Sequence, residues 1–231
     1  MLQLRNFDVL YGTSHVIHDM ALSLERGEIL CLLGRNGVGK TTLMRGIMGL
    51  TVNCRGALEL DGADLARLPT YERARRGIGY VPQGRDIVPG LTVLENIRLG
   101  LNARSDGRRE PPEIIWDLFP MLKEHLGRRG TNLSGGQQQQ LAIARALSAS
   151  PRVLLLDEPT EGIQPNVIQD IETAIHRINR EMGMSIIVIE QKVLFARSTA
   201  HRFAIMDKGR IVKAGKPQEL TDDVMHKYMG V

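Results

Sequence analysis

The sequence predicts an α/β fold, in which a core on a parallel sheet carries an N-terminal antiparallel β subdomain and an inserted α-helical subdomain. Three observations predict it. A glycine-rich motif lies between an apolar run and a helix-like stretch, two alternating apolar and polar segments precede it, and a helical pattern follows before strands resume near residue 152. We expect one domain over residues 1–231, with 1–83 and 151–231 forming the core with its β subdomain and 84–150 the helical subdomain.

Composition excludes several classes of protein. The chain has 231 residues, a formal net charge of +4 and only 4% aromatic residues, so the charge is interpreted as solvated surface rather than a nucleic-acid site with stacking aromatics. A part of it facing anionic lipid or a membrane partner is the alternative. We find no membrane-length apolar span and no signal segment, and Cys31 and Cys54 lack paired spacing, which indicates reduced thiols in the cytoplasm.

The first two segments alternate apolar and polar residues. Residues 2–11 and 16–24 are therefore expected to form an antiparallel hairpin. Tyr11 closes the first strand, where it could either pack at the sheet edge or offer an aromatic face to a nucleotide base.

Residues 34–42 fit the pattern G-x-x-x-x-G-K-[ST], after the apolar run 29–33 and before the helix-like stretch 43–50. Glycines let backbone N–H groups converge on an anion, and the following helix presents its positive end there. Lys40 should reach the β- and γ-phosphates, Thr41 should offer its hydroxyl to Mg²⁺, and Thr42 should bond the α-phosphate side. A turn that binds nothing is disfavoured because motif and flanks are both complete. The candidate nucleotide-binding residues are Gly34, Arg35, Asn36, Gly37, Val38, Gly39, Lys40, Thr41 and Thr42.

A strand over residues 57–60 and a short helix over 70–76 are expected next, followed by a buried strand over 79–83. Pro82 cannot donate to a sheet, so this strand should end there and place Gln83 at its end.

The middle of the chain reads as helical at residues 93–101, 114–126 and 138–148, with a charged, proline-bearing loop over 102–112. Ser134 is a plausible helix N-cap, and Gly135 and Gly136 leave backbone N–H groups approachable. Residues 133–137 are thus built like a second anion site, which would serve a nucleotide on another subunit. A bare capping motif is the alternative.

The strand over residues 152–157 ends in two adjacent carboxylates, Asp157 and Glu158. Ligands gather at the carboxyl ends of parallel strands, so this edge should meet the phosphate-binding motif. Asp157 is suited to hold Mg²⁺, through water molecules, and Glu158 to polarise an attacking water. Acidic surface residues at a strand end are the alternative. The remaining expected elements are a helix over 167–182, a strand over 185–189, a hairpin of 203–206 with 211–214, and a closing helix over 217–228.

Residues 34–42, Gln83, the Leu-Ser-Gly-Gly-Gln run 133–137 and the strand 153–158, in this order, resemble the ATP-binding subunit of an ABC transporter over essentially the whole chain. The resemblance implies the P-loop NTPase fold of the ABC ATPases, and hydrolysis of ATP, with Mg²⁺, to ADP and phosphate coupled to solute import. It implies stacking of Tyr11 on adenine. It also implies that two subunits sandwich two ATP molecules, so that Ser134, Gly135, Gly136 and Gln137 act in trans.

The resemblance assigns catalytic roles to Glu158, Gln83 and Gln191, and metal-binding roles to Thr41, Gln83 and Asp157. Gln83 would sense Mg²⁺ and the attacking water while its loop contacts the membrane subunit, and the helical lobe would dock a permease coupling helix. Two positions depart from the family. Gln191 stands where most members have a switch histidine, and cannot carry a proton's charge, and Gln164 stands where an aspartate is usual.

The residues 160–165 and 190–192 look like the importer branch for branched-chain amino acids, amides and urea, and most like its urea-uptake member. The partners implied are a second ATPase subunit, identical or paralogous, permease subunits, and a periplasmic solute-binding protein, with the chain peripheral on the cytoplasmic face of the inner membrane. The alternatives are a branched-chain amino acid importer, an exporter ATPase, a soluble ABC ATPase acting on nucleic acid or ribosomes, and a non-enzymatic nucleotide sensor. Tandem ATPase halves are usual in the soluble class, whereas this chain has one phosphate-binding motif.

Overall fold

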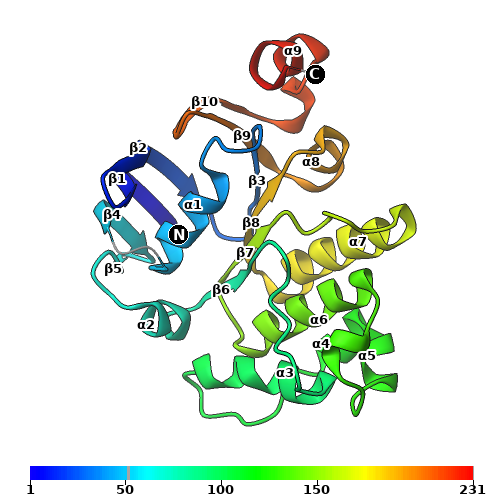
Figure 1. The fold of residues 1–231 in the computed structure, drawn as a ribbon. Helices are drawn as coiled ribbons and strands as arrows, with labels where there is room; N and C mark the ends of the chain where they lie inside the picture. The colour runs from blue at the N-terminus through cyan, green and yellow to red at the C-terminus, as the bar shows by residue number, and fades with distance from the viewer. Residues whose placement is uncertain (51–52, 231) are drawn as a thin grey trace.

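The computed structural model describes residues 1–50 and 53–230, which form a four-stranded sheet, a six-stranded sheet and the helices around them (Figure 1). The small sheet has the order β2-β1-β4-β5, and the large sheet has the order β10-β9-β3-β8-β7-β6. In Figure 1 the small sheet and the lobe that contains α3 to α6 lie on opposite sides of the large sheet. The predicted α/β class, with its antiparallel β subdomain and helical subdomain, is confirmed.

The small sheet contains β1 (Leu2–Tyr11), β2 (Ser14–Leu24), β4 (Asn53–Leu60) and β5 (Ala63–Asp64). The predicted hairpin is confirmed, with Leu2 opposite Leu24 and Tyr11 opposite Ser14. β4 is longer than predicted because a β-bulge, with Gly56 at a φ of 90°, lets its polar first half keep pairing with β1. A Cβ on Gly56 would lie 2.0 Å from the carbonyl oxygen of Asn6, so only glycine fits there.

The large sheet consists of β3 (Ile29–Leu33), β6 (Ile78–Val81), β7 (Val153–Asp157), β8 (Ser185–Glu190), β9 (Arg202–Asp207) and β10 (Arg210–Gly215). Its neighbours pair in parallel except β9 with β10. Every residue of β3, β7 and β8 is buried, as expected for parallel strands covered on both faces. Leu33 pairs with Glu190 and Asp157 with Ile189, so these three strands end at one edge.

Helices cover this sheet and build the lobe. α1 (Lys40–Met48) follows β3 directly, and α2 (Thr70–Arg75) precedes β6. The other helices are α3 (Val93–Leu99), α4 (Ile114–Leu118), α5 (Pro120–Glu124), α6 (Gly135–Ser148), α7 (Pro165–Met182), α8 (Val193–Thr199) and α9 (Asp222–Met229), with 3₁₀ turns η1 (Gly100–Ala103), η2 (Gly130–Asn132) and η3 (Pro217–Glu219). No helix among residues 1–50 and 53–230 is long and apolar enough to cross a membrane.

Two helix predictions need correction, and one helix was not predicted. A single helix over residues 114–126 is wrong, because Pro120 lacks an N–H and holds Phe119 out of the helical region, at φ −134° and ψ 65°, which separates α4 from α5. The predicted closing helix is likewise divided, since Thr221 caps a new helix, α9, after the η3 turn. The sequence reading also missed α8, which follows β8 after two residues.

Candidate nucleotide site

The phosphate-binding loop connects β3 to α1 and runs close to β2. Gly37 and Gly39 have φ values of 82° and 107°, which L-residues rarely adopt. A Cβ on Gly39 would lie 2.8 Å from Cδ1 of Ile17, so the loop needs glycine here for space as well as for conformation. The backbone thereby turns into the first turn of α1, whose unpaired N–H groups face the loop.

Lys40 is the first residue of α1 and is buried. Its Nζ donates to the carbonyl oxygens of Gly34, at 2.8 Å, and Arg35, at 3.0 Å, and lies 3.7 Å from Oε1 of Glu158. Burial lowers the pKa of Lys40, and the carboxylates of Glu158 and Asp157 oppose that change. The loop therefore holds a cation over its own carbonyl groups, at the place where phosphate oxygens would compete for it.

Asp157 ends β7 beneath the loop. Its Oδ1 accepts a hydrogen bond from Oγ1 of Thr41, at 3.2 Å, and its Oδ2 accepts one from the Tyr80 hydroxyl, at 3.3 Å. Burial raises the pKa of Asp157 to about 6, against the lowering effect of these hydrogen bonds. A cation bound at Thr41 would favour the ionised form of this carboxylate.

Glu158 has a φ of 49°, which is uncommon for a residue with a side chain and costs about 1–3 kcal/mol. Its N–H donates to the carbonyl oxygen of Ile189 at 3.1 Å, and its Oε1 accepts a hydrogen bond from Nε2 of Gln191 at 2.8 Å. The left-handed turn follows directly on β7, so the two adjacent carboxylates have different partners, Gln191 for Glu158 and Thr41 with Tyr80 for Asp157.

A cavity of about 280 Å³ opens over these groups. Eight of the predicted residues line it together with Val16, and the full lining is Val16, Asn36, Gly37, Gly39, Lys40, Thr41, Thr42, Gln83 and Glu158. The predicted meeting of the glycine-rich loop, Gln83 and the strand-end carboxylates is therefore present in the structure. Gln83 donates from Nε2 to Oε2 of Glu161, at 3.0 Å, and so connects the cavity to the loop that follows β7.

Two groups of predicted residues lie elsewhere. Within the described part of the chain, the cavity lining includes neither Tyr11, which is half exposed, nor residues 134–137. Those four residues begin α6, inside the helical lobe (Figure 1).

The start of α6 is a capping box. Ser134 Oγ accepts from the N–H of Gln137, at 3.4 Å, and the Ser134 N–H donates to Oε1 of Gln137, at 3.0 Å. α6 therefore begins at Gly135, three residues earlier than predicted. A Cβ on Gly136 would lie 2.5 Å from Cγ1 of Val167, so packing against α7 requires this glycine.

The donor set suits Mg²⁺, which prefers oxygen ligands and keeps several waters. Thr41 and Gln83 offer hydroxyl and amide oxygens in the cavity lining, and the Asp157 carboxylate lies directly behind Thr41, to which it is hydrogen-bonded. No group of three or more His, Cys, Asp or Glu that could hold a metal occurs in the residues that the structure describes. A cation at this site would therefore share its coordination with ligand oxygens and water.

Sequence reasoning missed three side chains at this site. Tyr80 bonds to Asp157, Glu161 bonds to Gln83, and Glu190 is buried next to Gln191. The signal for Glu190 was present, because it is a carboxylate directly after the four aliphatic residues of β8.

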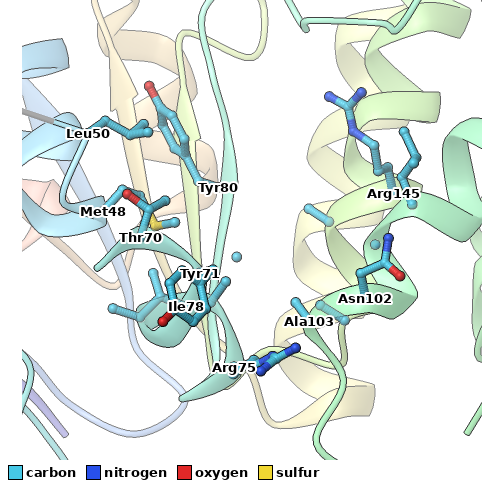
Figure 2. Close-up of a pocket in the computed structure, with 16 residues that line it drawn as sticks. Met48, Leu50, Thr70, Tyr71, Arg75, Ile78, Tyr80, Asn102, Ala103 and Arg145 are labelled. Carbon is cyan, nitrogen blue, oxygen red and sulfur yellow. The ribbon is translucent and has the colours of Figure 1, made fainter. Parts of the chain in front are cut away.

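A second, larger cavity of about 540 Å³ lies between α2, β6, η1 and the end of α6 (Figure 2). Its lining is mainly apolar, with Leu50, Tyr71 and Leu99 exposed to solvent, and its charged residues are Arg75 and Arg145. Arg145 donates to the carbonyl oxygens of Arg85, at 2.8 Å, and Asp86, at 2.6 Å. Arg145 therefore connects this apolar groove to the loop that follows Gln83.

Comparisons with known proteins agree with this geometry. The family model "ABC transporter" matches residues 17–161. The high-affinity branched-chain amino acid transport ATP-binding protein BraG of Pseudomonas aeruginosa is 37% identical over 213 residues, covering 92% of this chain and 91% of BraG. The lipopolysaccharide export system ATP-binding protein LptB of Haemophilus influenzae is 35% identical over 238 residues, covering 100% of this chain and 97% of LptB. The dimeric post-hydrolysis structure of the ATP-binding cassette MJ0796, bound to ADP and Pi, has a TM-score of 0.82 at 26% identity, and the match covers 94% of this chain and 99% of the MJ0796 chain.

Proposed function

The chain belongs to the ABC transporter family and is an ATPase of that family, and from this premise we propose that it powers the import of a small polar solute, namely urea or a short amide. The observation that carries the hydrolytic role is the cavity that brings Lys40, Thr41, Gln83 and Glu158 together. The choice of an importer rests on Gln191 at the switch position and on the similarity to BraG.

In the proposed reaction, the phosphates of ATP enter the cavity, and their oxygens replace the carbonyl oxygens of Gly34 and Arg35 as hydrogen-bond acceptors for Lys40 Nζ. Water attacks the γ-phosphorus, the bond from phosphorus to the ADP oxygen breaks, and Glu158 accepts the proton of the attacking water. Gln191 holds the Glu158 carboxylate in place through its amide.

Thr41, Asp157 and Gln83 would hold Mg²⁺, which supplies charge neutralisation for the phosphate oxygens. The buried Asp157 carboxyl supports this role, since its raised pKa reflects a charge without enough compensation in the ligand-free protein. Residues 34–42 would contact the phosphates, and Tyr11 would stack on adenine from the edge of β1.

The active unit is proposed to be a pair of ATPase subunits, either two copies of this chain or this chain with a paralogue. Ser134, Gly135, Gly136 and Gln137 would then contact the ATP of the opposite subunit, which fits their absence from the lining of this chain's own cavity among the described residues. The dimeric form of MJ0796 supports a paired arrangement.

Permease subunits are the proposed partners at the apolar groove of Figure 2, where Tyr71 and Leu99 stand exposed. We place the chain on the cytoplasmic face of the inner membrane, with a periplasmic binding protein delivering solute to the permease. Residues 84–150 would form the helical subdomain that docks, and residues 1–83 and 151–231 the core with its β subdomain.

Uptake of labelled urea and of labelled leucine tests this proposal, in cells that carry the wild-type chain, the Lys40→Ala variant or no chain. Lys123→Ala, which changes an exposed lysine on α5, is the matched control and should transport normally. Loss of urea uptake in Lys40→Ala is the expected result. Loss of leucine uptake alone would indicate that the transported solute is a branched-chain amino acid and not urea.

An exporter is the second candidate, because LptB matches the full length of this chain at a similar identity. Normal uptake of both solutes in Lys40→Ala cells would contradict the importer and favour this candidate. The groove residues would then contact an exporter permease, and the hydrolytic residues would keep their roles.

A further inference from the structure

We propose that Glu190 is a positioning residue for ATP hydrolysis, which holds the Gln191 amide against the Glu158 carboxylate and fixes the loop that follows β7. This inference rests on the proposed role of Glu158 as the acceptor of the water's proton. Glu190 itself lies outside the lining of the nucleotide cavity.

The Glu190 carboxylate is only 3% exposed and is held by three donors from two segments. Its Oε1 accepts from the N–H of Thr160, at 3.1 Å, and from the Thr160 hydroxyl, at 2.8 Å. Its Oε2 accepts from the N–H of Gln191, at 3.2 Å. One carboxylate therefore joins the end of β8 to the loop after β7.

Further bonds close this connection into a clamp. Lys192 Nζ donates to the carbonyl oxygen of Thr160 at 3.2 Å, and the Glu158 N–H donates to the carbonyl oxygen of Ile189 at 3.1 Å. Glu158 begins one of the two joined segments and Gln191 lies between Glu190 and Lys192 in the other, and their side chains meet at 2.8 Å. Because an ionised carboxylate only accepts hydrogen bonds, the Gln191 amide nitrogen must face Glu158.

The energetic cost of burying the Glu190 carboxylate indicates that this side chain has a specific role. Burying a carboxylate is costly unless its oxygens are bonded, and burial raises the pKa of Glu190 in spite of its bonds to Thr160 and Gln191. The five residues before it in β8 are buried, and four of them are aliphatic, so an apolar residue would fit the strand. An acid at this position therefore serves the placement of the two segments and not the burial of surface.

The expected effect follows from the geometry of proton transfer. A displacement of about 1 Å at a reacting group can lower a rate by about 100-fold. Glu190→Gln keeps the size of the side chain and keeps one acceptor for Thr160, but it turns an NH₂ group towards the Gln191 N–H. We expect kcat to fall about tenfold, with the KM for ATP unchanged, since the clamp lies outside the cavity.

The test compares ATP hydrolysis by wild type, Glu190→Gln and the matched control Glu181→Gln, which changes an exposed carboxylate paired with Arg177. The same substitution is repeated in a Gln191→Ala background. If Glu190 acts through Gln191, it should lower kcat less in that background than in the wild type. An equal loss in both backgrounds, a loss confined to KM, or a wild-type kcat would overturn the proposal.

Thr160 gives a second route that leaves the buried acid in place. Thr160→Val removes the hydroxyl donor to Glu190 at nearly constant shape, whereas Thr160→Ser keeps it. We expect Thr160→Val to lower kcat and Thr160→Ser to keep most of the wild-type kcat. Equal rates for the two variants would contradict the proposed role of the bond between Thr160 and Glu190. Wild-type protein that hydrolyses no ATP would refute the proposed function instead.

Discussion

Asp157→Asn should stabilise the ligand-free protein and at the same time weaken its stabilisation by Mg²⁺-ATP. Burial raises the pKa of Asp157 from 3.8 to about 6. Each pKa unit corresponds to about 1.4 kcal/mol, so the ionised carboxylate lowers the free energy of unfolding by about 3 kcal/mol at pH 8. Asparagine has no charge to bury and can still accept from Thr41 through its oxygen.

The stability difference between Asp157→Asn and the wild type should depend on pH. The pKa of Asp157 is about 6 in the folded protein and 3.8 in the unfolded chain. The folded state therefore binds this proton more tightly, which stabilises the protein fully below pH 3.8, and this contribution is lost as the pH rises through about 6. The advantage of Asp157→Asn should therefore be largest at pH 8, decline below pH 6, and be mostly gone near pH 4.

Urea denaturation of the two proteins, at several pH values and with and without Mg²⁺-ATP, measures both effects. Asp170→Asn, an exposed carboxylate on α7, is the control and should leave the midpoint unchanged. The wild type should gain about 2.7 kcal/mol at a ligand concentration of 100 times Kd, and Asp157→Asn should gain much less at the same concentration. A variant that is less stable than wild type at pH 8, or that keeps the full gain from Mg²⁺-ATP, would refute the reasoning.

Two further predictions concern packing. Gly136→Ala should destabilise the fold by about 1–3 kcal/mol, because the new Cβ would lie 2.5 Å from Val167, and Val167→Ala in the same chain should recover part of that loss in urea denaturation. A wild-type midpoint for Gly136→Ala would show that α6 and α7 can separate freely. Arg73→Ala should cost about 3 kcal/mol, because this buried guanidinium bonds to four carbonyl groups, two of them at the end of α1. Thermal unfolding against the control Arg67→Ala, which changes an exposed arginine, checks this, and equal midpoints for the two variants would show that the bonds from Arg73 to α1 do not stabilise the fold.

Much of the core was predictable because its signals are local. The apolar runs that became β3, β7 and β8 are buried along their whole length, and such runs are typical of central parallel strands. The glycine-rich loop needs its residues in one order, so its position followed from the pattern. The rule that parallel strands present their carboxyl ends together then placed Asp157 and Glu158 beside Lys40.

The missed features depend on partners that are distant in sequence. Tyr80 matters because β6 lies next to β7 and brings its hydroxyl to Asp157, and nothing in its own neighbourhood indicates that. Glu190 likewise finds Thr160 across 30 residues. The break between α4 and α5 was readable, because Pro120 disfavours a helical Phe119, and the apolar periodicity around it concealed the signal. The contacts of residues 134–137 with a second subunit stay a prediction.

The central claim is that Glu158 accepts the proton of the attacking water in a site that binds ATP through the loop from β3 to α1. Phosphate release by Glu158→Gln, with the transport partners present, tests it most directly, alongside ATP binding by the same variant. We expect hydrolysis to fall at least about 100-fold while ATP binding is retained, because the amide still fits the site but accepts a proton poorly. Hydrolysis by Glu158→Gln at close to the wild-type rate would contradict the account.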